Sequence, residues 1–134
     1  MMHMIARRIF TALLTPFLFL ASCTAEGDKT AVSVQTLREK LAKDPTTVVV
    51  DVRNADDLSG PLGKLDGVKH IPLADLPSRL SELSAHKNRE IHIICRSGNR
   101  SGKAASFLRE KGFQALNVTG GMISWRSSFQ NANR

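Results

Sequence analysis

Strands that alternate with helices over about a hundred residues predict an α/β domain with a central, mainly parallel sheet flanked by helices. Residues 47–52 and 91–95 are short, almost wholly apolar runs, typical of strands that are buried on both faces of a sheet. Residues 101–111 have apolar side chains at helical spacing and are followed by Gly112, a typical helix stop. We expect the domain over residues 31–130, with 131–134 as a C-terminal tail.

The first half of the domain follows the same rules. Ser33 can cap a helix that ends at Asp44, because Pro45 disfavours helical geometry in the residue before it. The pattern then predicts a strand at 47–52, polar turns over 53–67, a brief strand at 68–71 and a helix capped by Asp75.

The second half begins with the strand at 91–95 and the helix at 101–111, joined by a loop. A last strand is expected at 114–118, a turn at Gly120-Gly121 and a short final helix at 122–128. Each strand is separated from the next by a helix or a long turn, as parallel pairing requires.

The first 22 residues predict an export signal and not part of the fold. Arg7 and Arg8 precede an apolar run, and no acidic residue occurs before Glu26. The run of about 13 residues is shorter than the roughly 20 that a membrane-spanning helix needs. We interpret the arginine pair as an ordinary basic start rather than a twin-arginine signal.

The signal ends in Leu20-Ala21-Ser22-Cys23, which resembles the lipobox of bacterial lipoproteins. The resemblance implies that Cys23 is acylated and becomes the first mature residue, with 23–30 as a polar tether. We therefore expect a lipid-anchored protein on the periplasmic side of a bacterial membrane. Thr24 is not the aspartate that retains lipoproteins at the inner membrane, so the outer membrane is expected for a Gram-negative source.

Charge and residue types exclude several functions. The net charge is +7, and removing a signal with two arginines and no acid leaves +5. The chain has no Tyr and one Trp, and its basic residues are spread out, so no nucleic-acid partner is expected. His70 and His92 are unclustered, whereas zinc sites need three or four ligands, so no metal is expected.

Cys95 is the candidate reactive residue. It ends a buried strand and precedes a turn and a helix, which places it at the carboxyl edge of a parallel sheet, where ligands bind. Backbone N–H groups of the loop and helix N-terminus, together with Arg96 and Arg100, favour a thiolate. A structural cysteine would not need two arginines, a glycine and two hydroxyl residues directly after it.

Four segments resemble rhodanese domains, a family of sulfurtransferases. They are the active-site loop Cys95-Arg96-Ser97-Gly98-Asn99-Arg100-Ser101, Asp51-Val52-Arg53, Gly67-Val68-Lys69-His70-Ile71-Pro72-Leu73 and Gly120-Gly121-Met122-Ile123-Ser124-Trp125. Their order and spacing agree with the family over nearly the whole mature chain. The chain departs from it at Asp57, Leu58 and the stretch 59–66, which is about two residues longer, so the entrance to the site is expected to differ.

The resemblance implies a double displacement without a cofactor. The Cys95 thiolate would take the outer sulfur of an anionic donor such as thiosulfate and pass it to cyanide or a thiol. Loop residues 96–101 would bind the donor. Asp51 and Arg53 would support the site, with Arg53 paired to Asp51, Asp56 or Asp57 in preference to substrate.

Two other functions remain open. Cysteine phosphatases and arsenate reductases use a similar cysteine loop, but they place five residues between cysteine and arginine, whereas four separate Cys95 from Arg100. A non-catalytic rhodanese-like module would bind a partner or carry sulfur, although such modules usually lose the cysteine that this chain keeps.

Overall fold

The computed structural model describes residues 29–132. The expected export signal, the lipidation residue Cys23, most of the tether and the end of the tail lie outside this range. The elements run in the order β1 (Ala31–Ser33), α1 (Val34–Lys43), β2 (Val48–Asp51), α2 (Ala55–Ser59), β3 (Lys69–His70), the 3₁₀ helix η1 (Leu80–His86), β4 (Glu90–Ile94), α3 (Asn99–Glu110), β5 (Gln114–Thr119) and α4 (Gly121–Ala132).

The five strands form one sheet in the order β1-β5-β4-β2-β3, and every neighbouring pair is parallel. β4 lies at the centre, between β2 and β5. The loops that follow these three strands therefore meet at the same carboxyl edge of the sheet.

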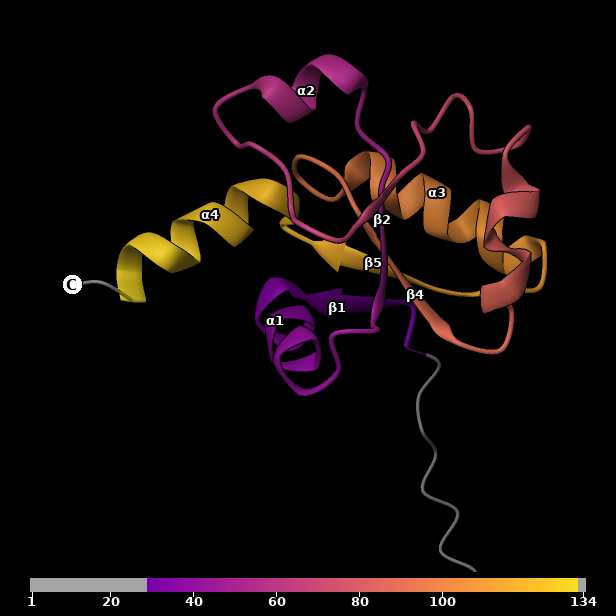
Figure 1. Ribbon diagram of the computed structural model, residues 1–134, viewed down its shortest axis with the longest axis horizontal. Coiled ribbons are helices and arrows are strands. Elements are labelled where there is room, and N and C mark those ends of the chain that lie inside the picture. Colours follow the sequence, from indigo (N-terminus) through magenta and orange to yellow (C-terminus); the bar gives the residue numbers. More distant parts are fainter. Residues whose placement is uncertain (1–28, 133–134) are drawn as a thin grey trace, which may run out of the picture.

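Helices cover both faces of the sheet (Figure 1). On one face α3 and η1 pack against a core that includes Ile91, Ile93 and Leu108, all fully buried. On the other face α1 and α4 enclose a smaller core with Leu37 and Ile94. The alternation along β4 sends successive side chains to opposite cores, which is why its isoleucines are all buried.

Sequence and structure agree at α1. Ser33 caps the helix, since its Oγ accepts a hydrogen bond from the Thr36 N–H at 3.1 Å. Leu37 is buried, and the helix ends at Lys43 with Asp44 as its C-cap.

The helix predicted from Asp75 is wrong in type. Residues 73–79 form turns, and only residues 80–86 are helical, as a 3₁₀ helix. The helix is interrupted at Arg79, whose φ of −105° and ψ of 14° lie outside the α-helical region.

Other elements and boundaries also differ; for example, α4 runs from Gly121 to Ala132, past the predicted end at 128. β1 and α2 were not expected, because one has three residues and the other is a five-residue polar helix inside the turn-rich segment. α3 begins at Asn99, two residues earlier than predicted, so Arg100 and Ser101 lie in its first turn. No helix among the described residues has the length and apolar character needed to cross a bilayer.

Candidate active site

Cys95 follows β4 directly and faces the carboxyl edge of the sheet. Its side chain is 1% exposed, and it packs at the end of the core that β4 shares with α3. It is a free thiol. A cysteine buried there is inert unless polar groups surround the sulfur, so the contacts of Sγ decide what it can do.

The loop after Cys95 turns so that a backbone N–H points back at the sulfur. The Gly98 N–H donates to Cys95 Sγ at 3.1 Å. Gly98 has a φ of 105°, which favours glycine, and a Cβ there would lie 3.3 Å from the Gly120 nitrogen. The conformation and the contact both need a residue without a side chain.

The start of α4 holds the same loop from the other side. The Met122 N–H donates to the Cys95 carbonyl at 2.8 Å, and the Ile123 N–H donates to the Arg96 carbonyl at 3.0 Å. These amides belong to the first turn of a helix, where N–H groups have no partner within the helix. A Cβ on Gly121 would overlap the Cys95 carbonyl oxygen and lie 2.7 Å from the Arg96 carbonyl carbon.

The hydrogen bonds that Cys95 Sγ accepts lower the pKa of its thiol. Burial alone would raise it, but a hydrogen bond from the Ser101 hydroxyl and backbone N–H groups of Ser101, Gly98 and Ser97 outweigh burial and bring it below its usual value. The surroundings of Sγ therefore favour the nucleophilic thiolate.

Ser101 contacts a residue that sequence reasoning missed. Its Oγ lies 3.2 Å from Cys95 Sγ and 2.7 Å from Oδ1 of Asn117, a half-buried residue of the neighbouring strand β5. The signal was an asparagine with apolar neighbours inside a strand, where this residue type is depleted.

The two loop arginines differ. Arg100 pairs with Asp57 of α2, with 2.9 Å between NH1 and Oδ2, and the hydrogen bond from Arg100 holds the pKa of Asp57 below its usual value. Arg96 is exposed and lines a pocket of about 350 Å³ beside the loop, together with Asp56 and the apolar Ile123. Only Arg96 therefore faces this pocket without a carboxylate partner among the described residues.

Ser97 and Asn99, the remaining residues of the predicted donor-binding loop, are exposed. The exposed Asn99 starts α3, while the backbone of Ser97 turns toward the sulfur. The loop thus presents its backbone to Cys95 and its polar side chains to solvent.

Asp51 and Arg53 form a buried ion pair below the loop. Arg53 NH2 lies 2.7 Å from Asp51 Oδ2, and the two side chains are 1% and 0% exposed. Arg53 also donates to the carbonyls of Asp57 and Gly63, while His70 Nε2 donates to the Arg53 carbonyl at 2.8 Å. Arg53 thus connects the sheet to residues 57–63 at the expected entrance to the site. Its guanidinium donates its hydrogen bonds to Asp51 and to these carbonyls.

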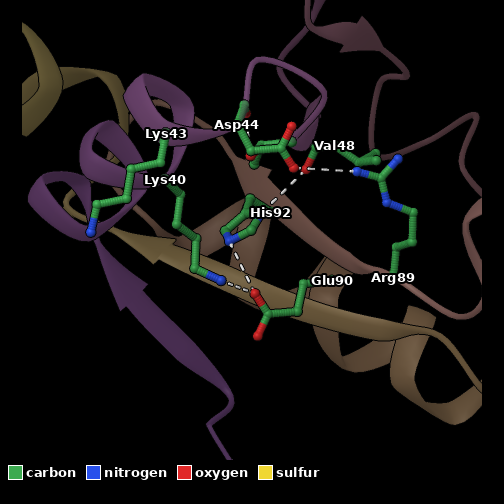
Figure 2. Close-up of a pocket in the computed structure, with 8 residues that line it drawn as sticks. Lys40, Lys43, Asp44, Val48, Arg89, Glu90 and His92 are labelled. Atoms are coloured by element: carbon green, nitrogen blue, oxygen red, sulfur yellow. Dashed lines mark hydrogen bonds and ion pairs between the residues drawn. The ribbon is translucent and has the colours of Figure 1, made fainter.

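A second pocket, of about 330 Å³, lies at the opposite, amino edge of the sheet (Figure 2). Ion pairs of Lys40 with Glu90 and of Arg89 with Asp44 line it. His92 lies beneath, with Nδ1 3.3 Å from the Val48 carbonyl oxygen and Nε2 without a hydrogen-bond partner in the described part of the chain. Within residues 29–132, no three side chains of the metal-binding types lie close enough to hold an ion.

Comparison with known proteins identifies the family. Residues 33–128 match the family model described as the rhodanese-like domain. The chain belongs to the rhodanese-like family. YtwF of Bacillus subtilis is 33% identical over 102 residues, which cover 76% of this chain and 95% of YtwF. A protein of Allochromatium vinosum named sulfurtransferase is 32% identical over 95 residues, 70% of this chain and 85% of that protein.

Solved structures agree with this assignment. The rhodanese-like domain protein of Staphylococcus aureus superimposes with a TM-score of 0.66 at 31% identity and covers 72% of this chain and 90% of its own. The predicted rhodanese-like α/β fold is therefore confirmed, with a sheet that is wholly parallel.

Proposed function

We propose that this rhodanese-like protein is a sulfurtransferase that carries sulfur from a donor such as thiosulfate to a thiol or cyanide as a persulfide of Cys95. The observation that supports the proposal most strongly is the surroundings of Sγ. The sulfur is buried, yet it receives the Gly98 N–H and lies within hydrogen-bond distance of the Ser101 hydroxyl. A relative that carries the name sulfurtransferase adds support.

The reaction has two displacements. The Cys95 thiolate attacks the outer sulfur of thiosulfate, the new S–S bond forms as the bond to the sulfonate breaks, and sulfite leaves with the electron pair. An acceptor thiolate or cyanide then attacks the outer sulfur of the persulfide, and the Cys95 thiolate leaves. The hydrogen-bond donors around Sγ stabilise the anionic sulfur in both the starting and the persulfide states.

The phosphatase alternative has little support from the geometry. A phosphatase needs its loop arginine free to grip an oxyanion, whereas Arg100 is paired with Asp57 across the site. A binding module that is not catalytic would have no need for the donors aimed at Sγ.

The test is thiosulfate-dependent modification of the full chain, followed by mass spectrometry. We expect Cys95 to gain the mass of one sulfur atom and to lose it when cyanide is added. Cys95→Ser should abolish the gain, while Cys23→Ser, the same change at the other cysteine, should retain it. A folded wild-type protein that never gains sulfur from thiosulfate or from a persulfide donor would refute the proposal.

We also propose that the protein is anchored through an acylated Cys23 on the periplasmic side of a bacterial membrane, and on the outer membrane if the source is Gram-negative. The support is the sequence alone, in the signal and its lipobox-like end. Cys23→Ser should lose incorporation of labelled fatty acid and keep a competent Cys95. A native N-terminus without lipid would end this proposal and leave the sulfurtransferase proposal untouched.

A further inference from the structure

The hydroxyl of Ser101 has one proton and two neighbours that can accept it. Ser101 is fully buried in the first turn of α3, with Oγ 3.2 Å from Cys95 Sγ and 2.7 Å from Asn117 Oδ1. The distance to the Asn117 oxygen is usual for a hydrogen bond, and the longer distance to the Cys95 sulfur is also suitable because sulfur is larger than oxygen. A hydroxyl donates one hydrogen bond at a time, so the two contacts cannot both be donated by Ser101.

The protonation state of Cys95 decides which contact is donated. When Cys95 is a thiol, its S–H can donate to Ser101 Oγ, and the Ser101 hydroxyl donates to Asn117 Oδ1, which completes a chain of donors. When Cys95 is a thiolate, the sulfur only accepts, and the Ser101 hydroxyl must turn toward it. Oγ and Oδ1 would then face each other 2.7 Å apart without a proton between them.

An asparagine can relieve this conflict because its amide carries both an acceptor and a donor. Turning the amide about its terminal bond replaces Oδ1 by Nδ2, which donates to the free lone pair of Ser101 Oγ. Gly102 leaves room for the amide, because a Cβ there would lie 3.3 Å from Asn117 Nδ2.

The backbone of Asn117 is held in place by its neighbours in the sheet. Asn117 pairs with Ile93 across β4 and β5, and its N–H donates to the Thr30 carbonyl at 3.0 Å. The side chain is half-buried, so the amide is not locked on every side.

We propose that Asn117 is a positioning residue for Cys95 that acts through Ser101: its amide oxygen faces Ser101 when Cys95 is a thiol, and its amide nitrogen faces Ser101 when Cys95 is a thiolate or a persulfide. The persulfide part rests on the proposed function, while the thiolate part does not. No atom is exchanged with solvent beyond the Cys95 proton itself, since the Ser101 proton only changes its acceptor.

The test measures the rate of Cys95 alkylation by iodoacetamide against pH, in the full chain with Cys23→Ser. In Asn117→Asp the ionised carboxylate can only accept, so it should hold the Ser101 hydroxyl away from sulfur. We expect the pH profile to shift upward and the rate at neutral pH to fall about tenfold, the size of a hydrogen bond to a charged group. Asn117→Ala removes one bond from each state and should change the rate by less than about twofold.

Two controls separate this role from the mere addition of a carboxylate to β5 and from a direct effect of that charge on Cys95. Gln114→Glu makes the same amide-to-carboxylate change at the exposed start of β5 and should leave the profile unchanged. In a Ser101→Ala background, the effect of Asn117→Asp should shrink several-fold. An effect of the same size with and without the Ser101 hydroxyl would overturn the proposal.

A measurement without any change at Asn117 covers the case in which the aspartate variant does not fold. The side-chain amide resonances of Asn117 in the protein with native Ser101 should titrate with the same midpoint as Cys95 alkylation, and amide resonances that do not move would overturn the proposal. Alkylation needs no sulfur donor, so this outcome is distinct from a failure of thiosulfate to modify Cys95.

Discussion

Removing the charge of Asp51 should destabilise the protein far more than removing any surface carboxylate. Asp51 accepts from the Arg53 backbone N–H, from Nε and from NH2, at 2.7–3.0 Å. In Asp51→Asn the amide keeps one acceptor oxygen and turns donor hydrogens toward the guanidinium. Arg53 would keep its contacts with the Asp57 and Gly63 carbonyls and with one amide oxygen, but it would lie buried without a counter-ion.

The magnitude follows from burial. Because both side chains are almost completely enclosed, losing one partner should cost about 3–5 kcal/mol of unfolding free energy. Surface pairs behave differently. Glu82→Gln, which breaks the exposed pair with Arg79, should cost less than about 1 kcal/mol.

Urea unfolding followed by circular dichroism measures both changes. With a slope of about 1–3 kcal/mol per molar urea, Asp51→Asn should lower the midpoint by about 2 M, while Glu82→Gln should lower it by a few tenths. The double variant Asp51→Asn with Arg53→Met removes both charges and should recover part of the loss. A midpoint for Asp51→Asn within the range of Glu82→Gln would refute the reasoning.

Three further predictions concern other parts of the protein. Gly121→Ala should slow Cys95 alkylation strongly, because a Cβ at this φ of 54° collides with the active-site loop; a folded variant with the wild-type rate would contradict this. Asp57→Asn frees Arg100 and should raise kcat/KM for thiosulfate about two- to fivefold in a steady-state assay, whereas an unchanged or lower value would exclude competition between Asp57 and the donor. Burial holds the pKa of His92 below its usual value, so the unfolded chain binds the extra proton; stability should fall as the pH drops below about 6.5, and an identical pH slope in His92→Leu would rule this out.

The central strands and helices could be predicted because their patterns are local. The apolar runs of β2 and β4 are too short for typical helices and therefore indicate buried strands. The Ser33 cap and the Gly112 stop mark helix ends. β1 could not be predicted, since its three residues gain their partner only when β5 is placed beside them. The 3₁₀ helix could not be predicted, because the leucine spacing does not distinguish one α-helix from turns followed by a 3₁₀ helix.

The active site could likewise be predicted only in part. The loop from Cys95 to Ser101 is contiguous in sequence and could be predicted as a unit. The contacts of its side chains cross long stretches of chain, since Arg100 meets Asp57 and Ser101 meets Asn117 only in the folded sheet. A basic loop in the sequence therefore becomes a loop with one arginine neutralised, and the electrostatic attraction expected for an anionic donor is correspondingly weaker.

The hydrogen bonds from α4 to the Cys95 loop have a consequence for the order in which the active site forms. The carbonyls of Cys95 and Arg96 find their partners in Met122 and Ile123, in the first turn of α4. A chain that lacks them would leave both carbonyls without their helix partners and the loop without one of its supports. We therefore expect the loop to aim the Gly98 N–H at Cys95 Sγ only once α4 has docked against it.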